Sequence, residues 1–113
     1  MPDRKTVDFL YWHAVTKMRA SDFEGAGVLF RLLRAAAPER SDVGLGHAYS
    51  LLRLGHVDKA TEVVADLRRR PMKPEEMALL GRLHRRCEFE LSRTIRKGST
   101  PARLRAARGE VVQ

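Results

Sequence analysis

A 34-residue internal repeat constrains the fold of this chain more than any other feature of its sequence. When the sequence is shifted against itself by 34 places, seven pairs of residues are identical within the first 68 residues. The pairs are Asp8 and Asp42, His13 and His47, Ala14 and Ala48, Arg19 and Arg53, Ala26 and Ala60, Leu33 and Leu67, and Arg34 and Arg68. Periods of this length are typical of helical hairpins that stack on one another, because a single hairpin cannot bury its apolar face alone.

Each repeat unit is predicted to form two helices separated by a short break. The break lies at residues 20–22 in the first unit and at residues 54–56 in the second, where a glycine or a small polar residue can end one helix and cap the next. The second helix of each unit then carries apolar side chains at helical spacing. These side chains are Phe23, Ala26, Phe30 and Leu33 in the first unit and Val57, Ala60, Val64 and Leu67 in the second.

Prolines mark the ends of the units, with Pro38 after the first and Pro71 and Pro74 after the second, because proline cannot continue a helix. From Pro74 the helical pattern continues to about Lys97 without identity to the repeat, as expected of a degenerate unit that caps a stack. No period-two run of β-branched residues occurs, so no sheet is expected. The predicted fold is all-α: a helical solenoid of two helix pairs plus a long degenerate capping helix, in one domain over residues 1–97. Residues 98–113 are predicted to be a basic tail that is either a short helix or disordered.

The residues at fixed places of each unit resemble the tetratricopeptide repeat. That repeat places a small residue in its first helix, a glycine and an aromatic or aliphatic residue at the turn, an alanine and a large apolar residue in its second helix, and a closing proline. Here those places hold Ala14, Ser21, Phe23, Ala26, Phe30 and Pro38, and then Ala48, Gly55, Val57, Ala60, Val64 and Met72. The Trp and Tyr of the repeat's first helix are missing, since Leu10 and Gly44 take the first place and Lys17 and Leu51 the second.

In size, in repeat number and in its Pro38-Glu39 turn, the chain resembles the small tetratricopeptide-type chaperones of bacterial type III secretion systems. The resemblance implies a binding module rather than an enzyme. Its partner would be a needle subunit or another small, early export substrate. A hetero-oligomer that could include a second co-chaperone is therefore expected, and a homodimer is the alternative.

The resemblance also implies a site, because in this family the first helix of each unit lines a concave groove. The implied groove residues are Tyr11, Trp12, Val15, Met18, Leu45, Tyr49, Leu52, Leu79, Leu80 and Leu83. Tyr11, Trp12 and Tyr49 would anchor a helical or extended apolar segment of a partner. The same surface is implied to include Gly46, Cys87 and charged residues of both signs, so charge flanks the apolar side chains. These charged residues are Asp8, Arg19, Asp42, Arg53, Glu76 and Arg86. The alternative is that these side chains face the domain's own core or a second copy of the chain.

The net charge of +8 is concentrated in the last two-fifths of the chain, where residues 68–113 hold thirteen basic and five acidic side chains. The candidate basic surface consists of Arg68, Arg69, Arg70, Arg82, Arg85 and Arg86. Such a surface can be merely solvated, bind an acidic protein or bind nucleic acid. The alternative function is therefore a small basic nucleic-acid-binding regulator that acts through residues 68–108.

The sequence contains no motif that supports catalysis or a cofactor. It has no GxGxxG motif, no P-loop and no nucleophile elbow. His84 and Cys87 could share a helix face, but a zinc site needs four ligands and Cys87 is the single cysteine. No catalytic residue, metal or cofactor is therefore expected. The charged residues near the N-terminus and the absence of an apolar run of about 20 residues predict a cytoplasmic protein that does not insert into a membrane.

Overall fold

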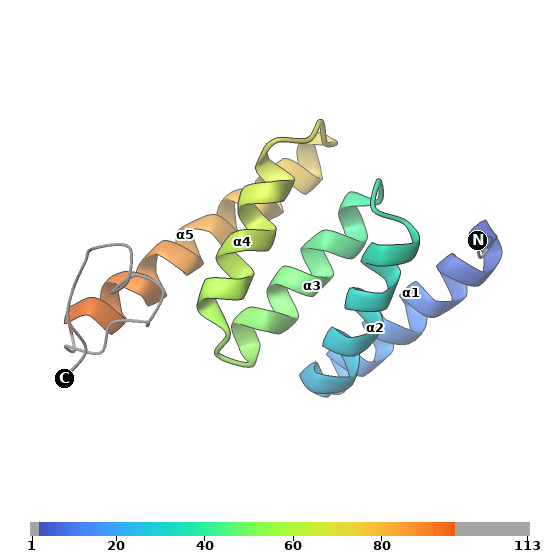
Figure 1. The fold of residues 1–113 in the computed structure, drawn as a ribbon, viewed down its shortest axis with the longest axis horizontal. Coiled ribbons are helices and arrows are strands. Elements are labelled where there is room, and N and C mark those ends of the chain that lie inside the picture. Colours follow the sequence, from blue (N-terminus) through green and yellow to red (C-terminus); the bar gives the residue numbers. More distant parts are fainter. Residues whose placement is uncertain (1–2, 97–113) are drawn as a thin grey trace.

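The computed structural model describes residues 3–96, and within this range the chain forms five α-helices and no strand (Figure 1). The helices are α1 (Arg4–Arg19), α2 (Phe23–Ala36), α3 (Ser41–Arg53), α4 (Val57–Arg68) and α5 (Pro74–Arg96). The predicted all-α class is confirmed. The predicted tail, residues 98–113, lies outside the described residues.

The helices are packed in the order of the sequence. Each helix contacts the next one along the chain, and α3 also contacts α1 and α5. Figure 1 shows that α1, α3 and α5 run in roughly the same direction, with α2 and α4 returning between them. The first helices of the two units and the long helix α5 therefore lie side by side along one face of the molecule.

Both hairpins turn by the same backbone arrangement, at the two breaks predicted from the repeat. Ser21 and Gly55, which are 34 places apart, both have positive φ, 64° and 83° respectively. The amide N–H of the following residue donates to the carbonyl five residues earlier, at 2.8 Å in the first hairpin and 2.9 Å in the second. This is the Schellman motif, which satisfies the free carbonyls at the end of a helix. In the first hairpin Asp22 then caps α2 by accepting from the amide of Gly25 at 2.9 Å.

Residues at equivalent repeat positions are buried in equivalent places. Of the predicted stripes on the second helices, Ala26, Phe30, Leu33, Ala60, Val64 and Leu67 are buried. They belong to two apolar clusters, one centred on α1 and α2 and the other on α3, α4 and α5. Side chains 34 residues apart on α2 and α4 are therefore buried in the same way.

Two glycines of α3 make room for the apolar side chains of the neighbouring helices. A Cβ atom at Gly44 would lie 2.7 Å from a methyl group of Leu67, and one at Gly46 would lie 2.4 Å from the ring of Phe30. Side chains at these positions would collide with the core, because interiors are packed without spare volume. Gly44 stands where the tetratricopeptide pattern has an aromatic residue, and here Leu67 occupies that space.

Replacing Phe30 by Ala should lower the free energy of unfolding by about 3 to 5 kcal/mol, because the ring is fully buried and its loss leaves a cavity. Urea denaturation followed by circular dichroism measures this change. The control is Leu32→Ala on the same helix, whose side chain is 59% exposed and whose loss should cost less than about 0.5 kcal/mol. Equal midpoints for the two variants would contradict the packing of α2.

His47 is buried between α2 and α3, whereas its repeat counterpart His13 is exposed. Only 7% of His47 is exposed. Burial, and after it the nearby guanidinium groups of Arg34 and Arg31, together lower its pKa from the usual 6.5 to about 4. Nη1 of Arg34 lies 3.2 Å from Nδ1 of His47, so the neutral ring can accept a hydrogen bond there.

Stability should therefore fall as the pH is lowered from 6.5 to about 4. In this window the unfolded chain binds a proton at His47 and the folded chain does not, which removes on the order of 2 to 3 kcal/mol in full. Urea midpoints at several pH values measure the loss. The protein's carboxylates contribute to the pH dependence in every variant. The slope of the urea midpoint against pH is therefore compared between His47→Gln and the wild type, and it should be smaller in His47→Gln. A slope unchanged in His47→Gln but reduced in His13→Gln would contradict this assignment.

Candidate partner-binding groove

A cavity of about 530 Å³ opens on the face formed by α1, α3 and α5. Its lining residues are Tyr11, Val15 and Met18 of α1, Phe30 of α2, Asp42, Leu45, Gly46 and Tyr49 of α3, and Glu75, Glu76, Leu79 and Leu83 of α5. Most of these side chains are apolar. We call this cavity the α1–α3–α5 groove.

Most of the predicted groove residues are brought together in this cavity. They are Tyr11, Val15, Met18, Leu45, Tyr49, Leu79 and Leu83. On each helix they are spaced three or four residues apart, which places them on one helix face. The three faces meet because α3 packs against both α1 and α5.

Trp12, Leu52 and Leu80 do not line the groove, contrary to the sequence-based expectation. Trp12 is 60% exposed and packs edge-on against Tyr11, with ring centroids 5.4 Å apart. Leu80 is buried and borders a smaller cavity of about 270 Å³ between α4 and α5. Both follow a groove residue by one position, which turns the side chain about 100° around the helix. Leu52 packs against the core cluster of α3, α4 and α5.

Phe30 and Glu75 line the groove but were not among the predicted groove residues. Phe30 belongs to the predicted core stripe of α2, and its ring reaches the groove only because Gly46 has no side chain. A glycine opposite a large apolar residue is the signal that could have indicated this contact. Glu75 lies beside the predicted Glu76 in the first turn of α5.

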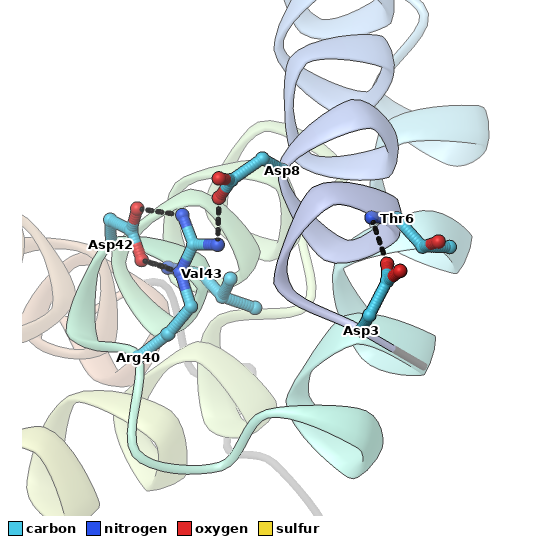
Figure 2. A network of polar contacts seen from close by, with 6 residues as sticks. All are labelled: Asp3, Thr6, Asp8, Arg40, Asp42 and Val43. Atoms are coloured by element: carbon cyan, nitrogen blue, oxygen red, sulfur yellow. Dashed lines mark hydrogen bonds and ion pairs between the residues drawn. The ribbon is translucent and has the colours of Figure 1, made fainter. Parts of the chain in front are cut away.

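An arginine between two aspartates joins the N-terminal half of α1 to the first turn of α3 at one end of the groove (Figure 2). Nη2 of Arg40 donates to Asp42 at 2.7 Å, and Nη1 donates to Asp8. Hydrogen bonds to Asp42 and then to Asp8 raise the pKa of Arg40 above its usual value, against the opposing effect of burial. The guanidinium carbon also lies 5.2 Å from the ring centroid of Tyr11. Arg40 therefore connects the ring of Tyr11, which lines the groove, to Asp8 of α1 and Asp42 of α3.

The charges along the groove differ between its two ends. Asp42, Glu75 and Glu76 all lie in the first turns of their helices, at the end that Arg40 stabilises. Near the other end, the guanidinium of Arg53 lies 3.5 Å from the hydroxyl of Tyr49. Among the described residues, the groove lining contains no basic side chain.

The predicted basic residues at the end of α4 are held by local contacts. Arg70 and Arg69 pair with Asp66 at 2.9 and 3.9 Å, and Arg68 contacts the ring of His84 at 3.1 Å. Arg70 also donates to the carbonyl of Pro38. These arginines therefore serve in part to join α4 to its neighbours.

The predicted basic residues of α5 lie on another surface than the arginines at the end of α4. Arg86 pairs with Glu90 at 3.1 Å. Arg82 and Arg85 are exposed and form no ion pair with any other residue of 3–96. Their counterparts 34 places earlier, Ala48 and Leu51, are both buried. The outer face of α5 thus carries charge at two positions whose counterparts in α3 are buried.

No group of three or more His, Cys, Asp or Glu side chains that could hold a metal ion occurs in residues 3–96. No helix within the same range combines the length and the apolar character needed to cross a bilayer. Comparison of the chain with protein-family models, with curated proteins and with solved structures finds no match.

Proposed function

We propose that this chain is a protein-binding chaperone or adaptor that holds a helical or extended segment of a small partner protein in the α1–α3–α5 groove. The observation that carries the proposal is the cavity of about 530 Å³ with a largely apolar lining. Leu79 and Tyr49 at this cavity are 41% and 36% exposed, so part of the apolar lining is open to water.

Burial of this surface is the driving force for binding. Covering apolar surface contributes about 25 cal/mol per Å², and an amphipathic helix laid into a groove covers such surface on both partners. Tyr11 and Tyr49 add rings with a polar edge, a combination that is common at interfaces. A partner segment held in the groove is shielded from water and from other copies of the partner, so it cannot aggregate or polymerise through that surface.

The resemblance to tetratricopeptide-type chaperones supports a narrower form of the proposal. In that form the chain acts in the cytoplasm and keeps a needle subunit or another early substrate of a type III secretion system unassembled until export. A second co-chaperone would then be a further partner. Size, repeat number and the Pro38-Glu39 turn are the features that support this form.

A photo-crosslinking amino acid placed at position 79 should capture the partner in the native cell, because Leu79 lies at the groove and is partly exposed. The same amino acid at position 32 is the control, since Leu32 is exposed on α2 and does not line the groove. Mass spectrometry identifies the product. Equal capture of one protein from both positions, or no position-specific product at 79, would contradict the proposal.

Once the partner is identified, Tyr49→Ala combined with Leu79→Ala should reduce the free energy of binding by roughly 2 kcal/mol or more, the scale of interface hot spots. Leu32→Ala should leave the affinity unchanged, and circular dichroism checks that each variant is folded. Trp12→Ala is informative as well, because Trp12 does not line the groove and its loss should cost less than the double change.

A nucleic-acid-binding regulator that acts through residues 68–108 is the second candidate. Arg82 and Arg85, which are exposed and pair with no other residue of 3–96, favour it. The two candidates differ in their response to salt, because phosphate contacts weaken steeply with ionic strength and apolar contacts do not. Under the groove proposal, Arg82→Glu with Arg85→Glu should change affinity for the partner by less than about threefold at 0.3 M salt. Loss of partner binding in this variant, with tight and salt-sensitive DNA binding by the wild type, would favour the regulator.

A further inference from the structure

The groove is an acidic region on a basic protein. The chain has a net charge of +8, yet the charged side chains that line the groove are the carboxylates of Asp42, Glu75 and Glu76. All three lie in the first turns of α3 and α5, so they gather at one end of the apolar lining. The nearest guanidinium, that of Arg40, is already shared between Asp42 and Asp8.

Glu75 is the carboxylate most open to a new partner. Asp42 is held by Arg40, and Glu76 accepts a hydrogen bond from the backbone amide of Lys73 at 3.2 Å. Glu75 is exposed and forms no hydrogen bond or ion pair with the other described residues. A carboxylate in this state, beside an apolar surface, can pair with a cation on a segment that enters the groove.

The opposite end of the groove carries the other sign of charge. Arg53 lies in the last turn of α3, with its guanidinium 4.9 Å from the ring centroid of Phe23 and 3.5 Å from the hydroxyl of Tyr49. Arg19 is exposed in the last turn of α1. Lys17 in the same turn is paired with Asp22 at 3.4 Å.

The apolar part of the groove between these ends is about two helical turns long. The apolar side chains from Tyr11 to Met18 on α1 span about 10 Å at 1.5 Å per residue. A helix that presents apolar side chains at positions i, i+3 or i+4, and i+7 covers this length.

We infer that the groove selects an amphipathic partner helix whose apolar face spans two turns and whose one end carries Lys or Arg. The basic end lies over Glu75 and Glu76, and the other end, without basic side chains, lies toward Arg53. The inference rests on the proposed function and assigns the basic end of the bound helix one place in the groove. Electrostatic complementarity of this kind excludes wrong partners and wrong orientations more than it adds affinity.

The test is selection of random 12-residue peptides displayed on phage against the full chain, with Glu75→Gln/Glu76→Gln as the matched control. Against the wild type, enriched peptides should carry apolar residues at the helical spacing and Lys or Arg concentrated at one end. Against the control, the apolar pattern should persist and the bias toward Lys and Arg should disappear. Carboxylate-to-amide changes keep the shape of the side chains, so the two selections differ chiefly in charge.

A selected peptide and a version with Glu in place of its Lys and Arg then provide a direct measurement. Fluorescence anisotropy at 0.1 M salt should give about three- to tenfold tighter binding for the basic peptide, the effect of two exposed ion pairs. The difference should shrink at 0.5 M salt because exposed charges are screened. It should be absent in the control variant at both salt concentrations.

The possible failures of the inference and of the proposed function are distinguishable. An apolar pattern without charge bias, or a bias that persists in Glu75→Gln/Glu76→Gln, overturns the inference and leaves the groove as a binding site. Absence of any apolar pattern overturns both. If the wild type forms dimers in sedimentation experiments and Tyr49→Ala dissociates them, a second copy of the chain occupies the groove. If a synthetic peptide of residues 97–113 competes with a selected peptide, the C-terminal segment of the chain occupies it. Either result overturns the inference.

Discussion

The contact between the ring of Phe30 and the backbone of Gly46 connects the core of this protein to its groove. The ring is fully buried, it meets the ring of Tyr11 at a centroid distance of 6.1 Å, and it occupies the space that a side chain at position 46 would need. Helices α1, α2 and α3 are therefore held by one aromatic residue that also lines the groove. Because core side chains are closely packed, the part of the groove wall that Phe30 forms is held in place by the core. A preformed wall lowers the entropic cost of binding a partner.

Acidic and basic side chains lie on different surfaces of this fold. The acidic side chains at the start of α3 and α5 lie at the groove, whereas Arg82 and Arg85 lie on the outer face of α5. Within the described residues, these two arginines are exposed and the groove lining contains no cation. Arg40, by contrast, lies between α1 and α3, where it pairs with Asp8 and Asp42.

Much of the helical framework could be predicted because the signals for it are local. The positive φ at Ser21 and Gly55, the proline ends and the apolar stripes on α2 and α4 depend on residues that are close in sequence. The groove residues were implied by the resemblance to the tetratricopeptide repeat, and those that line the cavity share a helix face because they are three or four places apart. Trp12 and Leu80 lie outside the cavity, because each follows a groove residue by one position and that step turns a side chain by about 100°. Leu52 packs against the core cluster of α3, α4 and α5 instead.

The sequence by itself determined five helices, their breaks, the repeat-equivalent core positions and the side chains that could form an apolar surface. The tertiary structure decided which of them meet. It placed Phe30 beneath Gly46, buried His47 while leaving His13 exposed, and joined Asp8 to Asp42 through Arg40. The two histidines have the same place in the repeat, yet His47 is buried beside Arg34 of α2 whereas His13 is exposed. Periodicity fixes the direction of a side chain on its helix, but burial, charge pairing and cavity shape depend on helices that are distant in sequence, and these are set only when the helices pack.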